Sequence, residues 1–172
     1  MNPIDASPIS FFVPGLAAPG GSKRAIWRPG MKHANVVEAC KRNPAWRQTV
    51  QVFAHQEYQG PPLTGALRLT ARFLMPRPKC HFRTGKHAGE LREDAPHWHT
   101  KKPDATKLLR AMEDALTGTL WVDDAQIAWQ EVEKVYGETP GAMITVERLD
   151  PANPRVEVTI REIAPGGQGR LL

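Results

Sequence analysis

The stretch KKPDATKLLRAMEDALTGTLWVDDAQI, residues 101–127, predicts one amphipathic helix followed by a short turn. Pro103 lacks an amide donor and keeps the residue before it out of the α region, so the helix is expected to begin just afterwards. Asp104 or Thr106 can cap it, because a side-chain oxygen there can accept a bond from a first-turn N–H. Gly118 should end it, since glycine tolerates the left-handed conformation that helix ends often require.

This helix has an apolar face and a charged face. Spacings of three and four predict one buried stripe, made of Leu108, Leu109, Met112, Ala115 and Leu116. Lys107, Arg110 and Asp114 recur at the same spacings along the other side. After the helix, a short turn leads to two consecutive acids, Asp123 and Asp124.

Acids at both ends of the stretch point to a cation site. Asp104 lies at the helix start, and Asp123 and Asp124 return after the helix. Converging carboxylates bind hard divalent cations, and Mg²⁺ held by carboxylates, waters and substrate phosphates is usual in phosphoryl-transfer sites. The alternative stays open that Asp104 only caps the helix, that Asp114 pairs with Arg110, and that the acidic pair is a polar turn.

Three segments of the stretch resemble the core signature of the RusA-type Holliday-junction resolvases, and their order is distinctive. They are Lys102-Pro103-Asp104, Asp114-Ala115-Leu116-Thr117-Gly118 and Asp123-Asp124-Ala125-Gln126-Ile127. A weaker similarity includes Ser22-Lys23-Arg24 and Lys134-Val135-Tyr136-Gly137, so the resemblance spans most of residues 11–149.

The resemblance implies a crossover junction endodeoxyribonuclease, a hydrolase of DNA recombination and repair that uses Mg²⁺, with Mn²⁺ as a substitute ion. Carried over by position, Asp104, Asp123 and Asp124 are the metal ligands and catalytic acids, and Asp124 matches the family's essential member. Arg110 takes the place of the catalytic basic residue. A homodimer acting on a four-way junction and a phage or prophage origin are further implications.

Two positions depart from the family pattern. Thr106 stands where a second acid is common, so the site carries one fewer negative charge, and Arg110 stands where lysine is usual. Thr106, Lys107 and Asp114 are expected only to support the site. The rival hypothesis is therefore a module that binds branched DNA without cutting it, because its metal site is weakened. A weaker third option is a structural domain whose acid pair only closes a turn.

Composition fits one basic domain. The 172 residues carry a formal net charge of +5, which suits a polyanionic partner but also serves solubility. Cys40 and Cys80 form no C-x-x-C pattern, so neither a disulfide framework nor a zinc site is expected, and a reducing cytoplasm is the default. The chain has no apolar run long enough to span a membrane and shows no signal-peptide pattern at its start.

The expected fold is α+β, with a mixed, largely antiparallel sheet of about five to six strands and two main helices, as in RusA. A single domain, residues 9–164, should lie between flexible tails at 1–8 and 165–172. Strands are predicted at 9–13, at 25–28 as its partner, at 66–75, at 127–136 and 142–149 as a hairpin, and at 156–163. The first main helix is predicted over 45–59, with Asn43 as its N-cap and Pro44 in its first turn.

Several basic residues are candidates for DNA contact. Lys23 and Arg24 follow a glycine-rich segment, and Lys101 and Lys102 precede the central helix. The alternative for the first pair is a mobile hairpin tip with solvated charges. Trp27 can pack inward or offer a stacking surface, and inward packing is the expectation.

Two other regions leave their roles open. Arg68 and Arg72 on strand 66–75 could face DNA or simply keep that face soluble. The long basic loop at 76–100 adds aromatic residues to its charge, a mixture suited to unpaired DNA. Its histidines, among them His97 and His99, are not expected to bind a metal, and its charges at residues 92–94 should be solvated.

Overall fold

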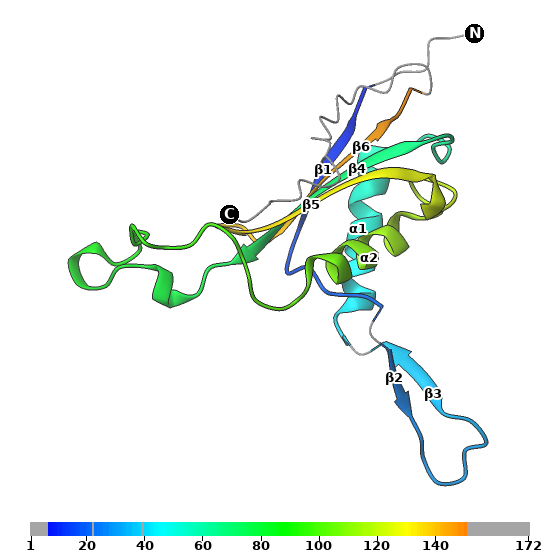
Figure 1. Cartoon of the computed structure of the whole chain (residues 1–172), viewed down its shortest axis with the longest axis horizontal. Helices are drawn as coiled ribbons and strands as arrows, with labels where there is room; N and C mark the ends of the chain where they lie inside the picture. The colour runs from blue at the N-terminus through cyan, green and yellow to red at the C-terminus, as the bar shows by residue number, and fades with distance from the viewer. Residues whose placement is uncertain (1–6, 22, 39, 151–172) are drawn as a thin grey trace, which may run out of the picture.

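A computed structural model describes residues 7–21, 23–38 and 40–150, and in it two helices lie across one face of a twisted sheet (Figure 1). The strands are β1 (Ile9–Pro14), β2 (Lys23–Ile26), β3 (Asn35–Glu38), β4 (Leu67–Pro76), β5 (Ile127–Gly137) and β6 (Gly141–Arg148). The helices are α1 (Asn43–Glu57) and α2 (Ala105–Leu116), with short 3-10 turns η1 (Lys79–His81), η2 (Gly85–His87) and η3 (Asp124–Gln126). The predicted α+β class is confirmed.

The six strands of the described chain fall into two sheets. The main sheet has four strands in the order β1-β6-β4-β5, and β2 pairs with β3 in a separate ribbon. Strand β6 is antiparallel to both β1 and β4, whereas β5 is parallel to β4. A parallel pair requires a crossover connection, and α2 lies within the one that joins β4 to β5.

The predicted hairpin of strands 127–136 and 142–149 is wrong, although both strands exist. Strand β4 lies between β5 and β6 and pairs with each of them. The connection from β5 to β6 therefore passes the end of β4, and Gly137 allows the close approach, since a Cβ there would lie 2.7 Å from Leu74 Cδ2. Gly141, the first residue of β6, instead lies tightly against β1, where a Cβ would overlap Phe12.

Two other predictions about the N-terminal half are also wrong. The segment predicted at 25–28 was expected to pair with the first strand, but β1 pairs with β6 and β2 pairs with β3. Trp27 does not pack inward, because 65% of its surface is exposed. At α1, Pro44 is in the first turn as predicted, but the N-cap residue is Arg42 rather than Asn43.

The core lies between the sheet and the two helices. Strand β4 alternates strictly, and its inward side chains are Leu67, Leu69, Ala71, Phe73 and Met75. The predicted stripe on α2 is confirmed, since Leu108, Leu109, Met112, Ala115 and Leu116 are all buried. Burial of this stripe, rather than helix propensity, holds α2 against the sheet.

The opposite face of β4 carries paired charges. Arg68 Nη2 lies 2.6 Å from Glu131 Oε1 of β5 and Arg68 Nη1 lies 3.5 Å from Glu147 Oε2 of β6. Arg72 forms an ion pair with Glu133. Of the two roles left open for these arginines, the structure supports a solvated face whose positive charge is balanced by neighbouring acids.

The loop at 76–100 has ordered local structure of its own. Phe82 and Leu91 form an antiparallel bridge within it, and Trp98 bridges to Val135 at the free edge of β5. The histidines have separate partners: His87 Nδ1 lies 3.1 Å from Glu90 Oε1, while the ring of His99 contacts that of Tyr136 at 4.8 Å.

The predicted strand at 156–163 and nearly all of both predicted tails lie outside the described residues, so the 9–164 domain boundary stays a prediction. No helix in the described ranges is long and apolar enough to cross a membrane.

The crowding at Gly141 yields a stability prediction. Its Cβ would also lie 2.5 Å from the carbonyl oxygen of Val13, a backbone atom that cannot move away cheaply. We expect Gly141→Ala to destabilise the fold by about 1–3 kcal/mol, the usual cost of overpacking. Thermal unfolding followed by circular dichroism measures it, with Glu138→Ala in the same connection as control. An unchanged melting temperature for Gly141→Ala would contradict this account of the packing between β6 and β1.

Candidate functional site

The segment before α2 is held by a lysine from the sheet. Lys134 of β5 donates from Nζ to the carbonyl oxygen of Lys101 at 2.6 Å and to that of Pro103. Asp104 is the N-cap residue, but its side chain makes no capping hydrogen bond. Its Oδ2 lies 3.4 Å from Lys107 Nζ, and 54% of the side chain is exposed. Asp104 therefore keeps a carboxylate that the helix does not use.

The turn after α2 is fastened by a buried tryptophan. Trp121 is fully buried, and its Nε1 donates to Thr117 Oγ1 at 3.1 Å. Gly118 has φ +80°, as its predicted role at the helix end requires. The amide of Leu63 donates to the carbonyl of Leu120 at 2.7 Å, which ties the turn to the chain just before β4.

The two consecutive acids have different surroundings. Gln126 Oε1 accepts from the amides of Val122 at 2.9 Å and Asp123 at 3.0 Å, and Asp123 Oδ1 accepts from the amide of Ala125 at 2.8 Å. This capping box at η3 uses the Asp123 carboxylate to hold the turn. Asp124 is exposed, and its side chain forms no hydrogen bond or ion pair with a described residue, while its backbone carbonyl accepts from the amide of Ile127. The structure therefore separates the two acids: the turn uses the carboxylate of Asp123, and that of Asp124 is uncommitted.

Glu113 is a candidate that the sequence analysis missed. It is half-buried on α2 and accepts a hydrogen bond from Gln130 Nε2 of β5. Burial raises its pKa above the ordinary 4.5, and the negative charges of Asp124 and Asp114 raise it further, while Arg110 acts in the opposite sense. Its spacing from Arg110, three residues along the helix, was the signal that could have identified it.

Arg110 is exposed on α2 and packs against the glycine-rich segment. A Cβ on Gly21, which has φ +76°, would lie 2.8 Å from Arg110 Cδ. The amide of Gly20 donates to the carbonyl of Lys107 at 2.8 Å. Gly20 and Gly21 therefore run along α2, and Lys23 and Arg24 follow as the first exposed residues of β2 rather than at the tip of the hairpin.

Asp114 does not pair with Arg110 as expected. Its Oδ2 lies 3.8 Å from Arg47 Nη1 of α1, and Arg47 Nη2 donates to its backbone carbonyl at 2.8 Å. Asp114 therefore joins the two helices, and the Arg110 guanidinium has no acidic side chain of the described residues within ion-pair distance.

The structure groups the candidate residues at the two ends of α2. Asp104 and Lys107 lie near its start, whereas Glu113 lies near its end and is close enough to Asp124 for the two charges to interact. Nine residues of helix separate Asp104 from Glu113, about 13 Å along the axis. In residues 7–21, 23–38 and 40–150, no three His, Cys, Asp or Glu side chains form a ready metal-binding group. Thr106 and the expected DNA contacts Lys23, Arg24, Lys101 and Lys102 are all exposed.

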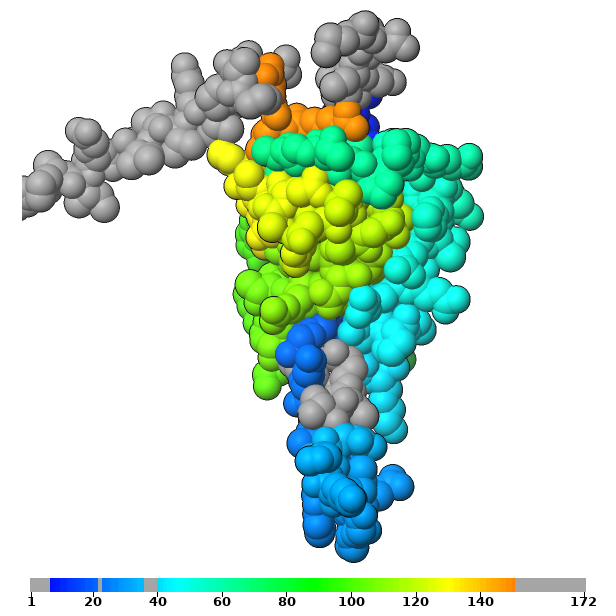
Figure 2. Space-filling model, turned by 90° about the vertical axis from the view of Figure 1, so that its right-hand side faces the viewer, coloured from blue at the N-terminus to red at the C-terminus, as the bar shows by residue number. Residues whose placement is uncertain are grey.

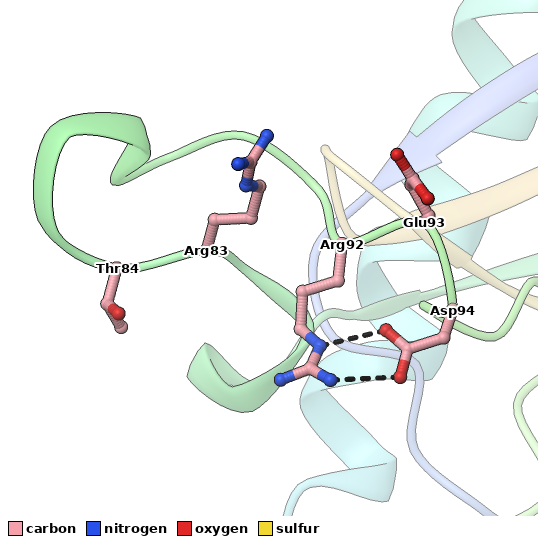
Figure 3. Close-up of a pocket in the computed structure, with 5 residues that line it drawn as sticks. All are labelled: Arg83, Thr84, Arg92, Glu93 and Asp94. Atoms are coloured by element: carbon pink, nitrogen blue, oxygen red, sulfur yellow. Dashed lines mark hydrogen bonds and ion pairs between the residues drawn. The ribbon is translucent and has the colours of Figure 1, made fainter.

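A surface hollow lies elsewhere, in the loop between β4 and α2 (Figure 3). Its lining residues are Arg83, Thr84, Arg92, Glu93 and Asp94. Arg92 donates to both carboxylate oxygens of Asp94, at 2.8 Å and 2.9 Å, and this hydrogen bonding lowers the pKa of Asp94. These charges are exposed to solvent as expected, and Arg92 and Asp94 in addition form an ion pair with each other.

Comparison with known proteins decides the family. Residues 17–147 match the family described as Endodeoxyribonuclease RusA. This chain belongs to the RusA family. A relative from Bacillus subtilis (strain 168), the uncharacterized protein YqaN, is 29% identical over 160 residues, which cover 91% of this chain and 97% of that protein. The RusA match includes α2, both acidic ends of the stretch and the β2–β3 ribbon, so the resemblance seen in the sequence is confirmed.

The raised pKa of Glu113 yields a pH prediction. The folded state favours its protonated form, so its contribution to stability is complete below the unfolded pKa and is lost as pH rises through the folded pKa. We expect Glu113→Gln to raise the melting temperature at about pH 8, with the gain shrinking towards about pH 4. Thermal melts across this range test it, and Glu93→Gln is the exposed control. A gain of equal size at both pH values would contradict the electrostatic origin.

Proposed function

We propose that this RusA-family endodeoxyribonuclease is a Mg²⁺-dependent, structure-selective enzyme that resolves Holliday junctions or other branched DNA by phosphodiester hydrolysis, in recombination and repair. One observation carries the proposal: the uncommitted Asp124 carboxylate lies close enough to half-buried Glu113 for their charges to interact, and Glu113 also interacts with Arg110, which lies about one turn earlier on α2. Acids that could hold a cation thus adjoin a base that could hold a phosphate.

The donor set fits Mg²⁺. All the candidate ligands are carboxylates, which are the hard oxygen donors that this cation prefers. Burial is the main cause of the raised pKa of Glu113, and the negative charges of Asp124 and Asp114 add to it; a divalent cation would relieve that added repulsion. Asp124 and Glu113 would hold the ion. The family position of Asp104 also implies a metal ligand, but Asp104 lies at the start of α2, about 13 Å along the helix axis from Glu113, so we do not assign it to the same ion.

Bound there, the cation would supply Lewis-acid activation of the phosphodiester. Arg110 would bind the phosphate oxygens and stabilise the charge that builds on them, and Gly21 packs against its side chain and limits its motion. Loss of one such preorganised donor typically costs about 3–4 kcal/mol of transition-state stabilisation. Asp123 would act indirectly, because its capping box holds Asp124 in place.

Cleavage of a labelled four-way junction tests the proposal, with a linear duplex of the same sequence alongside. We expect the wild type to cut only the junction and only with Mg²⁺, not with EDTA. Asp124→Asn should lower the rate by about 100-fold or more, since one charged group is lost from the site. Asp94→Asn is the matched control, because its acid lies in the hollow of Figure 3. Equal loss in both variants would reject the assignment of Asp124.

A non-cleaving module that binds branched DNA is the second candidate function. It is favoured by the neutral Thr106 and by the lack of a three-acid group among the described residues. Thr106→Asp separates the two functions. A competent nuclease should change little, because its site already holds the cation without an acid at this position. A large gain in junction cleavage would instead show that the wild-type site is crippled, in favour of the binding module.

We also propose a homodimer, because two symmetric cuts across a junction require two active sites related by a two-fold axis. Sedimentation equilibrium of the full chain, with and without junction DNA, tests it. A monomer in both conditions would contradict the proposal.

A further inference from the structure

The β2–β3 ribbon projects from the rest of the molecule. Its strands pair from Lys23↔Glu38 to Ile26↔Asn35, and neither strand joins the main sheet. Figures 1 and 2 show it as a narrow arm beyond the end of the helical layer. A two-stranded ribbon without a packed face is marginal as a structural element. Its presence therefore calls for a role outside the core.

The arm is predominantly basic. Residues 23–38 contain Lys23, Arg24, Arg28 and Lys32 together with His33, and one acid, Glu38, which lies opposite Lys23 at the base of the ribbon. All five basic side chains are exposed, and Arg24, Arg28 and Lys32, farther along the arm, form no ion pair with a side chain that the structure describes. The body of the protein differs, because several of its arginines have acidic partners: Arg47, Arg68, Arg72, Arg83 and Arg92. Unmatched cations on a projecting arm complement a phosphate backbone.

An exposed tryptophan follows the first strand of the arm. Trp27 is 65% exposed, more than any other large hydrophobic residue of the described chain that lies at the surface. It comes directly between Ile26 and Arg28, so an aromatic plane and a guanidinium are adjacent. Aromatic side chains on basic surfaces are platforms on which unpaired bases stack.

The arm is anchored beside the candidate active site. Gly20 bonds to the Lys107 carbonyl, and Gly21 lies against Arg110. Six residues separate Gly21 from Trp27, a reach of at most about 20 Å for extended chain. That reach corresponds to about six base pairs at 3.4 Å each. Trp27 can therefore meet the same branch whose phosphate lies at Arg110.

We propose that the arm binds branched DNA, with its lysines and arginines on phosphates and Trp27 stacked on a base exposed at the branch point. This inference rests on the proposed function and adds the source of its selectivity. Phosphate contacts act on any DNA, whereas a base face is open only where stacking is interrupted. The cations thus supply affinity, and the tryptophan distinguishes a branch from a continuous duplex.

Binding in EDTA tests the proposal without cleavage, using a four-way junction with 2-aminopurine at the branch point and a matched linear duplex. We expect Trp27→Ala to weaken junction binding by about ten-fold and duplex binding hardly at all. The 2-aminopurine signal should change on binding of the wild type and Trp27→Phe but not of Trp27→Ala. Trp98→Ala, which removes another exposed tryptophan, is the control and should bind like the wild type.

A charge variant tests the other half of the proposal. Arg28→Gln with Lys32→Gln should weaken junction and duplex binding alike and lower the slope of log K against log salt by about 2. Unchanged DNA binding in this variant, or in Trp27→Ala, overturns the inference. It is also overturned if Trp27→Ala weakens binding only because it dissociates a dimer. If such variants bind as the wild type does while the wild type cuts the junction, the proposed function stands. If the wild type neither binds nor cuts, both fail.

Discussion

The parallel pairing of β4 with β5 is the constraint on which the rest of the structure depends. Parallel neighbours cannot be joined by a tight turn, so the chain must leave the end of β4 and return to the start of β5. Helix α2 lies on that return path, with Asp104 at its entry and Asp124 at its exit. The same topology places β6 on the other side of β4. Acids twenty residues apart thus belong to one connection.

A few polar hydrogen bonds, some of them partly buried, fix the positions of the segments that this topology brings together. Lys134 binds the carbonyls ahead of α2, Trp121 closes the turn behind it, and Gln126 bonds the chain on both sides of η3. Such groups are costly to bury unless they are satisfied, so each specifies one arrangement. The outcome for chemistry is that Asp123 becomes part of the scaffold, whereas Asp124 remains available.

The distribution of charge follows the same division between scaffold and site. Arginines over the sheet and between the helices are matched by glutamates and aspartates, which limits their contribution to a long-range field. The β2–β3 ribbon is predominantly basic, with Glu38 as its one acid, so it contributes much of the net positive charge of the protein. The proposed attraction of this RusA-family protein for DNA is therefore assigned to an arm that starts beside Arg110.

The sequence alone determined the local features of this protein. Periodicity predicted the buried stripe of α2 and the alternation of β4, glycine chemistry predicted the end of α2, and an ordered signature identified the family. Tertiary structure alone decided the strand order, the pairing of Asp114 with Arg47, the proximity of Glu113 to Asp124 and the exposure of Trp27. The physical reason is range: helix and strand periods arise from neighbouring residues, whereas strand order and side-chain partners depend on contacts between segments far apart in the chain.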